Sequence, residues 1–251
     1  MFKSHLILLS AALALGRPSS SSCRATHQTP TLPQAGGASS LPQPPEGSRV
    51  IHIALGFGIQ NYTCAGVGED ATPDGAIAML YDVTGLYPGQ SRQSLPQKDW
   101  DELTSRVLRT HDVPLNLNSS TGGRVEPDSP GACHNNPFKQ DGPLRLEGAR
   151  ELPFLGHHLF NSAKVPEFVL NGGKIDLLSS KNSGVDAPAD ADKGPDGTGA
   201  VPWLALGAKD GTVGDARFVY RVSTAGGNSH GCAKTTGQDS TKYAAMYWFY
   251  G

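Results

Sequence analysis

A small set of polar side chains in this sequence could support acid–base or nucleophilic chemistry. His157 and His158 are adjacent in a segment expected to form a strand, where neighbouring side chains point to opposite faces. The inward-facing histidine is the better candidate for a base or a ligand, because histidine titrates near physiological pH. With Asp82, Arg221 and His230 the pair forms a candidate set for a hydrolase or a metal-assisted enzyme, provided that the fold gathers them in one pocket.

The segment Gly227-Asn228-Ser229-His230-Gly231 matches the GxSxG pattern of a nucleophile elbow. In that fold the acid and the histidine both follow the serine, yet no histidine follows His230. Ser229 and His230 are also direct neighbours, which disfavours contact between their side chains as nucleophile and base. The motif therefore does not support a serine hydrolase.

A second glycine motif, Gly56-Phe57-Gly58 followed by Ile59-Gln60-Asn61, imitates the start of a dinucleotide-binding turn. The third glycine is replaced by Asn61, residues 62–64 do not open a helix, and no alternation of strands and helices follows. We therefore expect a glycine-rich strand, no NAD-dependent dehydrogenase and no cofactor.

Metal sites are weakly supported. A zinc site would use Cys133, His134, His230 and Cys232, but the tight CxxC pair of such sites is missing and oxidation competes for the thiols. The acidic residues between 186 and 196 lack the spacing of an EF-hand and are typical of a solvated loop. We expect no metal centre.

The N-terminus predicts export. Residues 1–16 have a basic start, a short apolar core and a small residue at the expected cleavage point, and no other stretch is long enough to span a membrane. An even number of cysteines in an exported chain predicts two disulfides with three possible pairings, of which we favour Cys64 with Cys232 and Cys23 with Cys133. Asn61 and Asn118 begin glycosylation sequons.

The composition limits the partners and the fold. The formal net charge of −2 gives no attraction to nucleic acid or anionic lipid, and 31 glycines with 19 prolines favour turns over long helices. Residues 17–48 are rich in Pro and Ser and predict a disordered lead-in. A single domain is expected over residues 49–251.

Short segments rich in branched and aromatic residues predict an all-β domain, an antiparallel sandwich or flattened barrel. Apolar residues at helical spacing predict one short helix over 99–109, residues 171–173 suit a hairpin turn, and 113–148 read as a long turn-rich excursion. The expected strands lie at 49–55, 75–82, 156–160, 167–170, 174–178, 203–206, 217–223 and 243–250.

Aromatic residues near the C-terminus have two interpretations. Such rings can form a stacking platform for a glycan, but alternating aromatics in a strand more often fill a core on one face. The rings concerned are Trp203, Tyr220, Tyr247 and Trp248.

Several blocks of sequence, taken together and in order, resemble a family of exported fungal and bacterial proteins catalogued as a domain of unknown function. Members often carry the label malate dehydrogenase, which the failed dinucleotide motif contradicts. The resemblance covers nearly all of residues 50–251 and implies a fold and a compartment but no catalytic residues. Leu159 stands where an aromatic residue is expected. The blocks are 60–64, 80–82, 155–160, 201–206, 220–227 and 247–250.

The leading hypothesis is a secreted extracellular or cell-wall protein that binds a glycan or another small polar ligand without catalysis, because no catalytic set is complete. The alternative is a secreted hydrolase or metal-assisted enzyme built on the His/Asp/Arg set named first. A third possibility is a structural wall protein.

Overall fold

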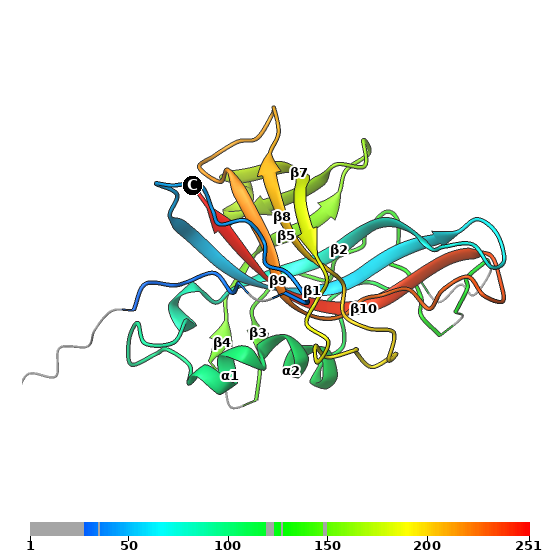
Figure 1. Ribbon diagram of the computed structural model, residues 1–251, viewed down its shortest axis with the longest axis horizontal. Helices are drawn as coiled ribbons and strands as arrows, with labels where there is room; N and C mark the ends of the chain where they lie inside the picture. The colour runs from blue at the N-terminus through cyan, green and yellow to red at the C-terminus, as the bar shows by residue number, and fades with distance from the viewer. Residues whose placement is uncertain (1–27, 35, 119–122, 127, 148–149) are drawn as a thin grey trace, which may run out of the picture.

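The computed structural model describes residues 28–251 apart from 35, 119–122, 127 and 148–149. The expected leader, residues 1–16, and Cys23 lie outside the described residues. Eight of the described strands form a closed antiparallel barrel in the order β1-β10-β9-β8-β7-β6-β5-β2 (Figure 1). They are β1 (Val50–Cys64), β2 (Thr72–Asp82), β5 (Phe154–Phe160), β6 (Pro166–Leu170), β7 (Ile175–Val185), β8 (Trp203–Ala208), β9 (Phe218–Gly226) and β10 (Gly237–Tyr250).

Each barrel strand pairs with the next barrel strand in the sequence, and β10 pairs with β1 to close the ring. Closure gives each of these eight described strands a neighbour on both sides, which is how up-and-down barrels satisfy their backbone hydrogen bonds. The expected all-β antiparallel class is confirmed, and the architecture is a barrel. Every strand expected from the sequence has its counterpart in this ring.

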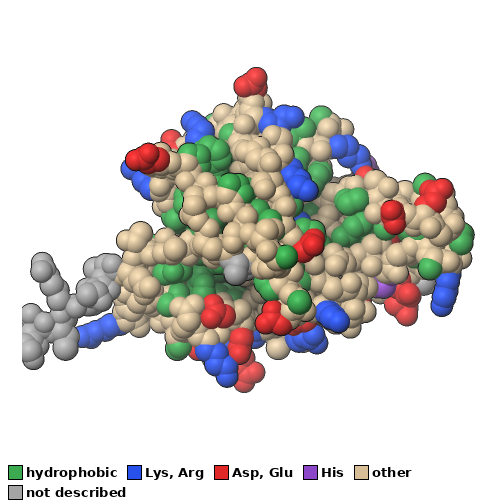
Figure 2. Space-filling view, viewed as in Figure 1, with side chains coloured by type: hydrophobic (Ala, Val, Ile, Leu, Met, Phe, Trp, Pro, Cys, Tyr) green, Lys and Arg blue, Asp and Glu red, His purple; other side chains and the backbone are tan. Residues whose placement is uncertain are grey.

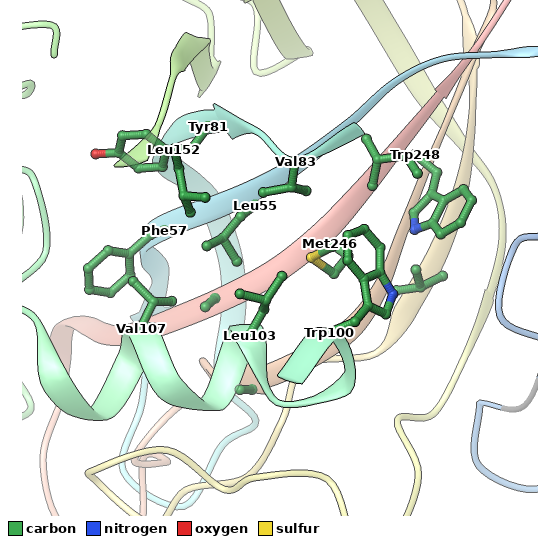
Figure 3. Close-up of a cluster of buried hydrophobic side chains, with 14 of the residues drawn as sticks. Leu55, Phe57, Tyr81, Val83, Trp100, Leu103, Val107, Leu152, Met246 and Trp248 are labelled. Carbon is green, nitrogen blue, oxygen red and sulfur yellow. The ribbon is translucent and has the colours of Figure 1, made fainter. Parts of the chain in front are cut away.

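The strand alternation divides the apolar side chains between two cores. On β10, Tyr247 and Phe249 belong to the cluster inside the barrel, whereas Met246 and Trp248 belong to a second cluster on its outer face. The outer cluster is covered by α1 (Gln97–Asp101) and α2 (Leu103–Thr110) (Figures 1 and 3). The helix expected over 99–109 is therefore present, in two segments that meet at Glu102.

The connection from β2 to β5 contains both helices, a 3-10 turn and two short strands, and it lies on the helical side of the barrel (Figure 1). It begins with a 3-10 turn, Thr84–Leu86, and ends with the two-residue strands β3 (Leu144–Arg145) and β4 (Glu151–Leu152). The turn predicted between β6 and β7 is present as a 3-10 turn at Asn171–Gly173.

Residues 28–48, expected to be disordered, lie against the outer core where they are described. Leu32 and Leu41 are buried in it, and the backbone N–H of Thr31 donates to the Tyr87 hydroxyl. These two leucines are the large apolar residues of a Pro- and Ser-rich segment, and burying them anchors it to the barrel. The ordered structure thus starts ahead of residue 49.

Glycines on the inner face of β1 make room for a large ring. A Cβ at Gly56 would lie 2.5 Å from Cε2 of Tyr247, and one at Gly58 would lie 1.9 Å from the backbone oxygen of Ile77. The motif that imitates a nucleotide-binding turn is therefore part of a continuous strand, and its glycines permit close packing inside the barrel.

Candidate functional site

A cavity of about 330 Å³ lies inside the barrel, toward the end at which β5 ends and β6 begins. We call it the barrel pocket. Its volume falls at the lower end of the range for small-molecule sites. Its polar lining residues are Gln60, Tyr62, His158, Lys181, Arg221 and Tyr247, and its other lining residues are Pro73, Gly75, Phe160, Pro166, Phe168, Val201, Pro202, Leu204 and Leu206.

Arg221 is the buried cation of the barrel pocket, only 8% exposed. Its Nε and Nη2 donate to the backbone oxygen of Pro202 at 3.2 and 2.9 Å, and its Nη1 donates to Oε1 of Gln60 at 3.3 Å. No Asp or Glu lines the pocket, and in the described part of the chain no carboxylate forms an ion pair with Arg221. The guanidinium of Arg221 therefore faces the cavity with hydrogen-bond partners that are all neutral.

His158 lies on β5 and is 4% exposed. Its Nδ1 lies 3.0 Å from the backbone oxygen of Glu167, which can only accept, so Nδ1 carries the proton and Nε2 carries a lone pair. The imidazole stacks on Phe168 with 4.1 Å between ring centroids. Burial lowers the pKa of His158 to about 4, and the charge of Arg221 adds to this effect while the bond to Glu167 opposes it. The side chain is neutral at pH 7.

Two tyrosines of the barrel pocket have hydroxyls with protein partners. The Tyr62 hydroxyl donates to the backbone oxygen of Gly227 at 2.8 Å, and the Tyr247 hydroxyl lies 2.9 Å from that of Tyr243. Burial raises the pKa of Tyr62 to about 12 and raises the pKa of Tyr247, although the charge of Arg221 lowers it in part. Both phenols are therefore neutral donors or acceptors at physiological pH.

Of the five candidate catalytic residues, the structure brings only His158 and Arg221 together in the barrel pocket. His157 lies on the outer face of β5, where its Nε2 is 2.9 Å from Oδ1 of Asp141 and its ring stacks on Phe138. The two histidines thus point to opposite faces of the strand.

Asp82 lies at the end of β2, where its Oδ1 accepts hydrogen bonds from the backbone N–H and the hydroxyl of Thr84, and its Oδ2 lies 3.4 Å from Nδ1 of His52. Burial raises the pKa of the Asp82 carboxyl, but the contact with His52 and the hydrogen bonds from Thr84 outweigh it and hold the pKa below the usual value. These contacts fix the turn that follows β2.

His230 lies in the loop before β10, beside the fully buried carboxylate of Asp239. Asp239 accepts from the Ser229 hydroxyl at 2.6 Å and from the backbone N–H of His230 at 2.8 Å, and its Oδ1 lies 2.7 Å from His230 Nδ1. The Ser229 hydroxyl thus donates to the carboxylate and not to the imidazole. The GxSxG segment holds no nucleophile–base pair.

The four aromatic residues considered as a platform do not share a surface. Trp203, Tyr220 and Trp248 are buried in the outer core, where Trp248 makes edge contacts with Tyr87 and Trp100. Tyr247 alone lies inside the barrel and reaches the barrel pocket. Three of these rings serve packing.

The disulfide between Cys64 and Cys232 is confirmed, with 5.4 Å between the Cα atoms. It takes Cys232 out of the zinc set that the sequence offered. Cys133 forms no bond with a described cysteine, and its expected partner Cys23 lies outside the described residues. Of the sequon asparagines, Asn118 is exposed, whereas Asn61 is half-buried and accepts a hydrogen bond from Ser240.

A larger hollow of about 650 Å³ lies outside the barrel between the 113–140 excursion and the ends of β1, β2 and β10. It contains charges of both signs, including the ion pair of Asp74 with Lys164 at 2.8 Å. Acidic and basic side chains are also interspersed over the face in Figure 2. The barrel pocket is lined by the cations Arg221 and Lys181 and by no acidic side chain, so it favours anions more selectively than this hollow does.

Sequence reasoning missed Gln60, Tyr62 and Lys181 as lining residues. A signal was present, because Arg221 interrupts the otherwise uncharged strand β9 and Gln60 follows Gly56 and Gly58 on the same face of β1. A polar residue at an inward position of a closed barrel marks a site.

None of the helices in the described part of the chain combines the length and the apolar character that a bilayer crossing requires. No curated protein and no solved structure matches the chain significantly. The pattern of a family described as "Protein of unknown function (DUF3455)" matches residues 44–251. This match spans the whole barrel with its buried cationic pocket, and the chain therefore belongs to the DUF3455 family.

Proposed function

We propose that this chain is a secreted extracellular or cell-wall protein that binds a small organic anion in the barrel pocket and releases it unchanged. The observation that carries the proposal is the guanidinium of Arg221, which is buried in a cavity without a carboxylate partner. The export leader expected at residues 1–16 and the Cys64–Cys232 disulfide support the compartment.

A buried charge is costly unless an opposite charge or a complete set of hydrogen bonds compensates it. Arg221 has five N–H donors, and the three contacts that it makes with Pro202 and Gln60 are all to neutral oxygens. A carboxylate entering the cavity would supply the missing charge through strong, charge-assisted hydrogen bonds. The exposed Lys181 at the rim would add to the attraction of an anion.

The walls of the barrel pocket define the rest of the ligand. Phe160, Leu204, Leu206 and three prolines line it, so the group attached to the anion is apolar. This favours a small ligand over a glycan, since a glycan needs exposed stacking rings and Trp203, Tyr220 and Trp248 are buried.

A second candidate function is a secreted enzyme, most simply a hydrolase, that acts on the same bound anion. It is favoured by the meeting of the neutral base His158 with Arg221 in one cavity. The two candidates differ in whether the bound compound is recovered unchanged after long incubation, which mass spectrometry measures.

The proposal is tested by a thermal-shift screen of the disulfide-intact protein with matched pairs of an acid and its neutral analogue. Suitable pairs are hexanoate with hexanol and benzoate with benzamide. We expect the acid of at least one pair to raise Tm with concentration, because ligands that bind only the folded state stabilise it. A response to the neutral analogues alone, or to none of the acids, would reject the proposal.

A further inference from the structure

We infer that the anion bound in the barrel pocket also carries a hydroxyl group, so that the ligand is a small hydroxylated carboxylic acid with an apolar body. In this arrangement Arg221 binds the carboxylate and Nε2 of His158 accepts the hydroxyl proton in a hydrogen bond. The inference rests on the proposed function and names the ligand class of the same site.

A backbone contact determines which ring nitrogen of His158 is the hydrogen-bond acceptor. Because Nδ1 of His158 donates to the backbone oxygen of Glu167, Nε2 must carry the lone pair. In the described part of the chain no donor reaches Nε2, and the ring lines the cavity. Nε2 is not among the buried atoms without a partner, so it is accessible from the cavity, where a ligand that supplies a hydroxyl donor can reach it.

Nε2 of His158 remains a hydrogen-bond acceptor at neutral pH. Burial lowers the pKa of His158 to about 4, so the ring does not become a donor under physiological conditions. Arg221 and His158 line the same cavity, and the charge of Arg221 also lowers the pKa of His158. The guanidinium of Arg221 requires an anion, and Nε2 of His158 requires a hydrogen-bond donor.

The two polar contacts and the walls restrict the size of the ligand. The volume of about 330 Å³ lies at the lower end of the range for small-molecule sites and limits the ligand to a small molecule. Phe160, Leu204 and Leu206 supply apolar contact for the part of the ligand between or beside its polar groups. A hydroxylated aromatic acid and a hydroxylated medium-chain acid both satisfy these limits.

The experiment measures Kd by calorimetry for two parent acids and their hydroxylated forms. The probes are benzoate with 2-, 3- and 4-hydroxybenzoate, and hexanoate with 2- and 6-hydroxyhexanoate. We expect at least one hydroxylated form to bind the wild type about five-fold or more tighter than its parent, since one hydrogen bond to a buried acceptor is being made.

The variant H158F retains an aromatic ring against Phe168 and removes the lone pair. We expect it to bind the parent acids as the wild type does and to lose the preference for the hydroxylated form, to within about two-fold. The matched control is H157F, on the outer face of the same strand, which should keep the preference. If H158F fails to fold, the ¹⁵N shift of His158 Nε2 in the wild type must change with the hydroxylated form and not with its parent.

The possible failures are distinct. Parent and hydroxylated acids that bind equally well, or a preference that survives in H158F, would overturn the inference and leave the proposed function intact. If neither the parent acids nor their hydroxylated forms bind, both are rejected.

Discussion

Two residues on opposite sides of the barrel, Arg221 on β9 and His158 on β5, determine the chemistry of the pocket. Arg221 brings a permanent charge into an apolar interior, and His158 is kept neutral by burial and fixed in one tautomer by Glu167. The sequence singled out both residues, and the alternation of a strand predicted that only one of His157 and His158 faces inward. Which of them faces inward depends on the pairing of β5 with β2 and β6, which no local pattern contains.

The depressed pKa of His158 predicts a loss of stability in acid. The unfolded chain binds this proton near pH 6.5 and the folded chain only near pH 4, so unfolding takes up a proton between these values. The free energy of unfolding should therefore fall as the pH falls from about 6.5 to about 4, by up to roughly 3 kcal/mol. Urea denaturation at pH 7, 5 and 4 measures it.

H158F has no imidazole to protonate at this position. Its free energy of unfolding should therefore fall less between pH 7 and pH 4 than that of the wild type. H157F should follow the wild type. An unchanged pH dependence in H158F would contradict the burial of a neutral imidazole.

At the level of elements, β1 provides the space on which the pocket depends. Its inward positions are Ala54, Gly56 and Gly58, followed by the polar Gln60. The small residues admit the ring of Tyr247 and a close approach of β2, and Gln60 then fixes the guanidinium of Arg221. The sequence indicated a glycine-rich strand here, but the reason for the glycines required the facing strands.

The variant G58A should be strongly destabilised, because its Cβ would lie 1.9 Å from a backbone oxygen that cannot move without breaking the β1–β2 pairing. We expect a loss of at least about 2 kcal/mol in the free energy of unfolding. The control G85A has nothing within 4 Å of the new Cβ and should change stability by less than about 0.5 kcal/mol. Equal stabilities of the two variants would show that β1 and β2 do not approach as described.

For the whole molecule, the closure of the barrel is the feature that local sequence patterns left open. All eight strands were indicated by their composition, but closure of the ring depends on the pairing of β10 with β1, the last and the first barrel strands in the sequence. The burial of Leu32 and Leu41 was missed for a related reason, since their partners are supplied by the outer core and not by the surrounding segment.

The disulfide joins the two ends of the barrel sequence across 168 residues. Cross-linking residues so distant in the chain restricts the unfolded state, so the double variant C64S/C232S should lose about 2–5 kcal/mol of stability. Chemical denaturation with and without a reductant measures this loss. The reductant should lower the stability of the wild type toward that of the variant, and a wild type indifferent to it would contradict the prediction.

The central claim is that Arg221 binds an organic anion inside the barrel, and its most direct test is the Kd of one carboxylate for three proteins. The acid with the largest thermal shift is titrated into the wild type, R221Q and R217Q, where Arg217 is an exposed arginine that precedes the same strand. We expect R221Q to bind at least about ten-fold more weakly, since it loses a charge-assisted contact worth about 1.5–3 kcal/mol, and R217Q to bind as the wild type does. Equal binding by the wild type and R221Q would show that the anion site lies elsewhere and would contradict the account.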